Sequence, residues 1–148
     1  FARDWGNMIE RSGKVEAAME MYEQSYAAYG RAVKLDSKNV RLRNDLALIA
    51  IHHLDRDWDE TRALLEGAIA DGNETLENSP PDDANDLERL NEAVGDSYEN
   101  LALWHLKHSG DGAAAKAAAT KSLDYYPGKG RPGARRHLRA AEQLLQGK

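Results

Sequence analysis

Apolar residues recur at intervals of three and four along most of the chain, which is the spacing of one face of an α-helix. The longest run begins at Lys14 and ends near Leu35. Its members are Val15, Ala18, Met19, Tyr22, Tyr26, Tyr29 and Val33. A second line on the same helix is formed by Ala17, Met21, Ala28 and Ala32. A helix with two apolar lines predicts packing neighbours on two sides, as in a layered helical array.

Polar breaks divide this pattern into helices. The main breaks are residues 35–39, the proline-rich stretch 77–86 and residues 126–133. The predicted helices are 2–12, 14–35, 38–56, a helix opened by residues 57–60, 83–108, 112–125 and 132–146. No segment alternates apolar and polar residues as a half-buried strand would. With only four prolines and few β-branched residues, the chain is predicted to be all-α.

Short polar residues mark the predicted helix starts. Ser37 is a plausible cap for helix 38–56, and one of the two acids at 82–83 is expected to cap helix 83–108. Asp57 and Glu60 have the spacing of a capping box, in which each side chain satisfies free backbone N–H groups. Gly72 and Asn73 are expected to loosen or end the helix that this box opens.

Two stretches of the chain match each other at an offset of 55 residues. The sequence DLALIAIHHLDRDW at 45–58 lies over NLALWHLKHSGDGA at 100–113. The clearest aligned pairs are Leu46 with Leu101, Ala47 with Ala102, Leu48 with Leu103 and His53 with His108. Each stretch leads into a helix through a break that contains Asp, which indicates a repeated helix pair.

In its turns and small residues the chain resembles the tetratricopeptide repeat family. The matching segments are SYAAYGRAVKLDSKN at 25–39, RDWDETRALLEGAIADG at 56–72 and SGDGAAAKAAATKSLDYYP at 109–127. In the last segment, the family's turn, small and closing positions fall on Gly110, Asp111, Ala115, Ala119, Ser122 and Pro127. The successive units are spaced more widely than the usual repeat of about 34 residues.

The resemblance implies a single domain built as a right-handed superhelix. Its helix hairpins would be 2–35, 38–78 and 83–126, with a C-terminal capping helix at 132–146 that covers the last hairpin. Small side chains are expected where the helices approach closely, because a larger residue would force the layers apart. These are Ala32, Ala47, Ala68, Ala102 and Ala115.

The resemblance also implies a concave groove, lined by the first helix of each pair, that binds a protein or peptide. The candidate groove residues are Asn7, Arg11, Asp45, Ile49, His53, Asn100, Trp104, Lys107 and His108. Trp104 has the chemistry of a binding hot spot, and core packing is the other interpretation. Asp45 and Ile49 stand where family members that hold C-terminal carboxylates use cations or amides, which argues against that specificity.

Charge is unevenly distributed along the 148 residues. Residues 1–112 carry 12 Lys and Arg against 23 Asp and Glu, a net charge of −11, whereas residues 113–148 carry eight against two, or +6. An acidic body argues against nucleic-acid binding. The basic tail either contacts an acidic partner or packs beside the acidic body. No apolar run reaches the length of about 18 residues that a membrane span needs.

The five histidines raise the question of a metal site. His105 and His108 are three apart on one helix, near His52 and His53 if the helix pairs stack, and such a set could hold zinc. Partly buried or groove-lining side chains are the simpler interpretation, so no metal ligand is predicted. The GKGRPG stretch at 128–133 follows a helix and not a strand, so it is interpreted as a loop.

No arrangement of residues in the sequence calls for an enzyme or a cofactor, and the chain contains no cysteine. We therefore expect a non-catalytic scaffold that binds a protein or peptide. One alternative is an accessory helical region of a larger enzyme or lipoprotein that begins before Phe1. Others are a histidine-based metal-binding protein and self-association. The sequence does not indicate a compartment.

Overall fold

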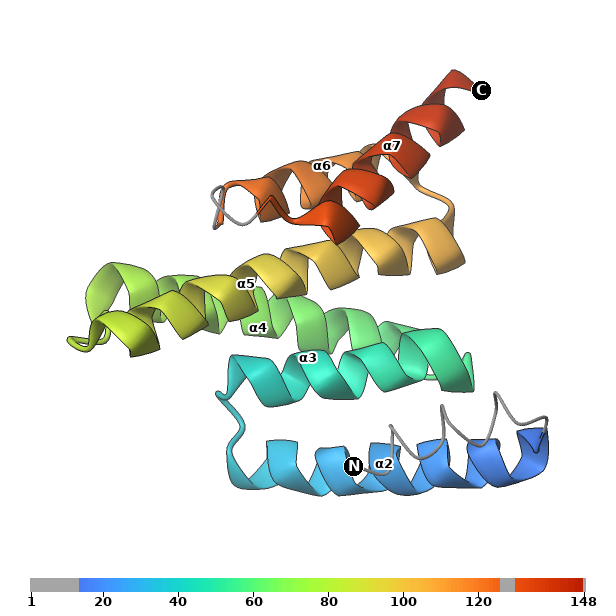
Figure 1. Cartoon of the computed structure of the whole chain (residues 1–148), viewed down its shortest axis with the longest axis horizontal. Coiled ribbons are helices and arrows are strands. Elements are labelled where there is room, and N and C mark those ends of the chain that lie inside the picture. The colour runs from blue at the N-terminus through green and yellow to red at the C-terminus, as the bar shows by residue number, and fades with distance from the viewer. Residues whose placement is uncertain (1–13, 126–129, 148) are drawn as a thin grey trace.

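The computed structural model describes residues 14–125 and 130–147 (Figure 1). These residues form helices and connections, with no strand among them, so the all-α prediction is confirmed for this part of the chain. The α-helices are α2 (Val15–Leu35), α3 (Val40–Ile49), α4 (Trp58–Asn78), α5 (Ala84–Trp104), α6 (Gly112–Leu123) and α7 (Pro132–Gln146). The predicted helix 2–12 and the candidate residues Asn7 and Arg11 lie outside the described residues.

The helices form a stack in which each one packs against the next. Figure 1 shows α2 at one end of the stack and α6 with α7 at the other. Alternate helices also pack: α3 contacts α5, and α5 contacts α7. The central helix α5 therefore has neighbours on several sides, which is why apolar and small residues extend around much of its circumference.

Small side chains lie where the helices approach most closely. Ala47, Ala68, Ala102 and Ala115 are fully buried, as expected, whereas Ala32 is only half-buried. Gly72 serves the same purpose on α4, because a Cβ atom there would lie 2.4 Å from Cγ2 of Val94. The prediction that Gly72 loosens or ends its helix is wrong: α4 continues to Asn78 and uses this glycine to admit a neighbouring side chain.

The helix caps follow the sequence prediction in part. Asn39, and not Ser37, caps α3 by accepting a hydrogen bond of 3.0 Å from the backbone N–H of Leu42. Asp83 caps α5 as predicted, accepting from the N–H of Asp86 at 3.0 Å. The capping box at Asp57 is wrong, because its backbone is left-handed (φ 56°) and its side chain makes no capping bond.

The carboxylate of Asp57 instead accepts a hydrogen bond of 3.1 Å from the hydroxyl of Tyr26 on α2. Tyr26 and Tyr29 are partly buried against a core cluster that contains Tyr22, as the sequence predicts for this line of tyrosines. The Asp57 side chain therefore binds a neighbouring helix and does not cap its own.

Two short π-helical turns extend α3 and α5, one at Ala50–Leu54 and the other at His105–Ser109. They are 55 residues apart, which is the offset of the sequence match. Each turn ends in a left-handed residue, Asp55 (φ 50°) and Gly110 (φ 66°), whose N–H donates to the first carbonyl of the turn. The repeated sequence therefore corresponds to a repeated backbone, and each repeat widens its helix at the C-terminal end.

A buried polar network joins α3 to α5. The Asn44 side chain donates to the carbonyl of Ala93 at 2.9 Å. Its amide oxygen accepts from the Ser97 hydroxyl at 3.0 Å and from Nδ2 of Asn100 at 3.2 Å. These buried groups satisfy one another only in one register, so the network fixes how α3 lies along α5.

A buried arginine attaches α7 to the stack. Arg131 donates to the carbonyl of Tyr125 at 2.6 Å, to Asp96 at 2.8 Å and to the carbonyl of Glu92 at 3.1 Å. The other oxygen of Asp96 accepts from Arg41 of α3 at 2.8 Å. Asp96 therefore links the start of α7 to both α5 and α3.

Replacing Arg131 with methionine is expected to lower the free energy of unfolding by about 3 kcal/mol, because the substitution breaks a largely buried ion pair. Urea denaturation followed by circular dichroism measures this change. The control is Arg89→Met, which removes an exposed pair with Asp86 and should change stability by less than about 0.5 kcal/mol. Equal effects of the two substitutions would contradict the role given to Arg131.

Gly72→Ala should lower the free energy of unfolding by about 1–3 kcal/mol, because the new methyl group overlaps Val94. Gly30 of α2 is the matched control, since a Cβ atom there meets nothing within 4 Å. Gly30→Ala should raise stability by about 0.5–1 kcal/mol through helix propensity alone. Thermal denaturation tests whether Gly72→Ala lowers the stability while Gly30→Ala raises it.

Candidate functional site

Three of the predicted groove residues are covered by the protein itself. Ile49 is fully buried in the cluster between α2 and α3, and Asn100 is 6% exposed within the network with Asn44. Trp104 is 3% exposed and donates its indole N–H to the carbonyl of Trp58 at 2.8 Å. These three residues therefore do not line an open groove: Ile49 is covered by α2, Asn100 by α3, and Trp104 by α3, α4 and the first π-helical turn.

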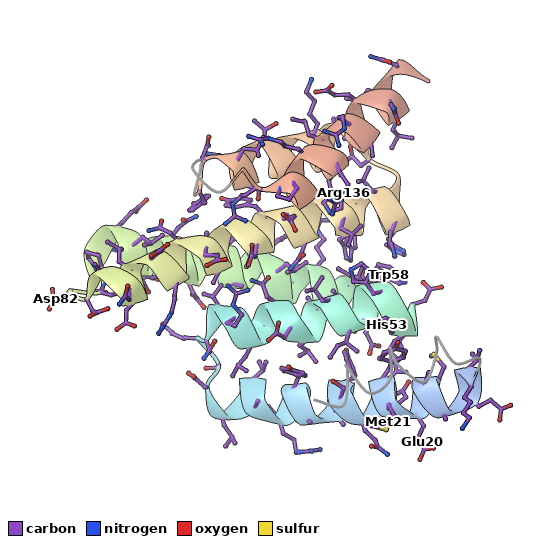
Figure 2. The ribbon with its side chains drawn as sticks, in the orientation of Figure 1. Glu20, Met21, His53, Trp58, Asp82 and Arg136 are labelled. Atoms are coloured by element: carbon purple, nitrogen blue, oxygen red, sulfur yellow. The ribbon has the colours of Figure 1, made fainter. Side chains whose placement is uncertain are left out.

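The other described groove residues lie near the surface: Asp45, His53, Lys107 and His108. His53 is half-buried, and its ring stacks on Tyr22 of α2 with centroids 3.7 Å apart and planes within 5°. Figure 2 shows His53 between α3 and α2. Lys107 and His108 are exposed on the second π-helical turn. The structure therefore retains a smaller surface at the C-terminal ends of α3 and α5.

A depression of about 290 Å³ lies at this surface. Its lining residues are Ile51, His52, Asp55, Trp58 and Lys107. It is formed by both π-helical turns together, and His52 and Lys107 are the residues that the 55-residue match aligns. We call the surface formed by His52, Asp55, Trp58, Lys107 and His108 the His–Trp surface.

Ring stacking holds the His–Trp surface in place. The His108 imidazole lies parallel to the Trp58 indole, with centroids 4.6 Å apart and an interplanar angle of 6°. Trp104 packs edge-on against both rings from below, and the Arg62 guanidinium lies 5.3 Å from the centroid of its ring. The Trp58 indole N–H donates to Asp55 at 3.1 Å. The two stacked rings therefore have fixed orientations before any partner binds.

The sequence interpretation left Trp58, His52 and Asp55 out of the groove. The repeat alignment pairs His52 with Lys107, which was a predicted groove residue, so His52 could have been found from the sequence. Trp58 and Asp55 lack such a signal, because the aligned residues are Ala113 and Gly110. Their place follows only from the way in which the first repeat turns into α4.

His105 lies beneath this surface. Its Nδ1 atom is 3.0 Å from the Ser109 hydroxyl, and its ring packs edge-on against Trp104. Burial lowers the pKa of His105 below its ordinary value, and the positive charge of Arg62 lowers it further. A nucleophilic serine needs such a histidine contact, but the neighbouring Asp111 directs its carboxylate to the N–H of Ala114 and caps α6. The contact between His105 and Ser109 is therefore part of the packing at the end of this helix.

The histidines do not form a metal site among the described residues. No three His, Asp or Glu side chains in this part of the chain are grouped closely enough to hold a metal ion. His105 faces the interior, His108 stacks on Trp58, and the Trp104 ring packs edge-on against both imidazoles.

A second cavity, of about 380 Å³, lies where α7 begins beside α5. Its lining includes Asp96, Glu99, Arg131 and Arg136. Burial raises the pKa of Glu99 above its ordinary value, and the nearby charge of Asp96 raises it further, although the N–H of Ala134 donates to the carboxylate. The charged side chains around this cavity attach α7 to the stack, so the packing of α7 explains their arrangement.

The chain matches no protein-family model and no curated protein sequence. No helix among the described residues is long and apolar enough to cross a membrane.

Acidification is expected to destabilise the protein through His105. Since the folded-state pKa is lowered, the stability contributed by the neutral ring is complete above the ordinary pKa of 6.5. That stability is lost as the pH falls from there through the lowered value. The free energy of unfolding should therefore fall between pH 7.5 and about 5.5 less steeply in His105→Gln than in the unaltered protein. An identical pH dependence in both proteins, measured by urea denaturation, would show that His105 does not titrate as described.

Proposed function

We propose that this chain is a non-catalytic scaffold that binds a protein or peptide, built as a tetratricopeptide-like array. The order of helix contacts supports the array. Each helix packs on the next, and the alternate helices α3, α5 and α7 pack on one another. The repeated π-helical turns and the buried alanines at helix crossings are further support.

In such an array α3 and α5 are first helices and α7 is the cap. The described contacts of α4 are with its neighbours α3 and α5 and with the first π-helical turn, and no comparable packing joins it to α2 or α6. The first helices α3 and α5 and the cap α7 are therefore closer to one another than the second helices α2, α4 and α6 are. This is expected for a superhelix that curves around its first helices.

The observation that carries the proposed function is the half-exposed Trp58 indole, held flat against His108 beside the exposed Lys107. A tryptophan in a preformed depression, with hydrogen-bonding groups around it, is typical of a protein-binding hot spot. Since Trp58 and His108 are already oriented, a partner would not have to order them on binding.

The partner that fits this surface is a peptide segment with an apolar or aromatic side chain next to hydrogen-bond acceptors. The stacked rings provide the flat apolar contact. Lys107 provides hydrogen-bond donors on the rim, beside the His52 ring. The Asp55 carboxylate is already engaged by Trp58, so the remaining exposed charge of the depression is that of Lys107.

The test is a selection of peptides from a random display library on the whole chain, followed by affinity measurement. Lys107→Ala/His108→Ala should weaken the selected peptides about tenfold or more, because it removes the rim cation and one of the stacked rings. The control is Lys116→Ala/Lys121→Ala, which alters two exposed residues of α6 and should leave affinity unchanged. Equal affinity for all three proteins, or the absence of any selected peptide, would reject the proposed surface.

A further inference from the structure

Two arginines of α7 carry charge that the described part of the chain does not neutralise. Arg135 and Arg139 are exposed, and neither forms an ion pair with another described residue. They are four apart, so they are neighbours on the helix and repel each other. Arg131, four residues earlier, is different because it is buried and bound by Asp96. We call Arg135 and Arg139 the arginine face.

Arg135 lies at an electrostatically unfavourable position on α7. Arg135 is in the first turn, which contains no acidic residue. The N-terminal end of a helix carries the positive end of its dipole, so cations there are disfavoured and an anion is favoured. An anionic group from outside the described chain would therefore be attracted by the helix and by both guanidinium groups.

Exposed acidic residues lie at the end of α4 and in the α4–α5 connection. Glu74 and Glu77 lie in the last two turns of α4, and Asp82 follows in the connection. All three are exposed, none forms an ion pair with another described residue, and the last turn of α4 contains no basic residue. Anions at a helix C-terminus oppose the dipole. We call these three residues the acidic corner.

The two patches do not meet within one molecule. Figure 2 shows Asp82 at the outer tip of the α4–α5 connection and Arg136, the neighbour of Arg135, on α7 well away from that tip. Figure 1 likewise shows the connection projecting from the side of the stack and α7 beyond α5. Each patch is therefore available to a second molecule.

We propose that the arginine face of one copy binds the acidic corner of a second copy. Residues three or four apart on a helix hold their side chains about 5–6 Å from each other. The Glu74–Glu77 pair and the Arg135–Arg139 pair therefore have matching spacings, and two helices lying side by side bring each guanidinium next to a carboxylate. The contact places favourable charge at both helix ends.

The contact joins different patches on the two copies, so a free arginine face and a free acidic corner remain after each addition. The copies therefore associate head to tail. The interface consists of exposed ion pairs, which are weak and are screened by salt. Association is consequently concentration-dependent and strongest at low ionic strength. This inference does not depend on the proposed peptide-binding function.

Sedimentation velocity over a range of protein concentrations tests the proposal. At an ionic strength of about 20 mM the average mass should rise with concentration, and at about 500 mM the protein should be a monomer. Arg135→Glu/Arg139→Glu and Glu74→Lys/Glu77→Lys should each lower the association constant roughly tenfold or more at low salt. Lys116→Glu/Lys121→Glu on α6 makes the same change in net charge as the arginine reversal and should leave association intact.

The decisive sample is an equimolar mixture of the two charge-reversed proteins. The reversed α7 of the first is complementary to the reversed corner of the second, and the unaltered patches are also complementary. Association should therefore return in the mixture. The proposal is overturned if the unaltered protein remains a monomer at low salt, if either reversed protein associates normally, or if the mixture does not associate.

Discussion

The close contact between α3 and α5 is the constraint on which the rest of the structure depends. Asn44 bonds the Ala93 carbonyl and accepts from Ser97 and Asn100, so the two helices are fixed in register. Because both also pack against α4, only small side chains fit at crossings such as Ala68. The fixed register then places residues of both π-helical turns around a single depression, which is lined by His52 and Lys107.

The helix content, the helix limits within a few residues and the small residues at the crossings could be predicted from sequence, because burial at intervals of three and four is recorded in the residues themselves. The helix caps were predicted less well than the helices themselves. Asp57 has the local spacing of a capping box, but the Tyr26 hydroxyl on another helix binds its carboxylate. The π-helical turns have no periodic signature of their own, although the repeat showed that whatever occurs at 50–54 should recur at 105–109.

The candidate site was less predictable for a related reason. Helical spacing places Ile49 and Trp104 on a given face of their own helices, but it does not say which neighbouring helix covers that face. Both proved to be core residues. Trp58, which was not among the predicted groove residues, is the half-exposed ring of this surface, with Trp104 packed edge-on against it and His108 stacked on it. The proposed binding surface therefore arises from tertiary packing and not from one helix.

The proposed function requires a partner to contact Trp58 while Trp104 remains inside the fold. Nuclear magnetic resonance of the two indole N–H groups during titration with a selected peptide tests this most directly. We expect a large shift of the Trp58 signal, since that side chain lines the depression. The Trp104 signal should change little, because its N–H stays bonded to the Trp58 carbonyl. A Trp58 signal that is unmoved by a tightly bound peptide would contradict binding at the His–Trp surface.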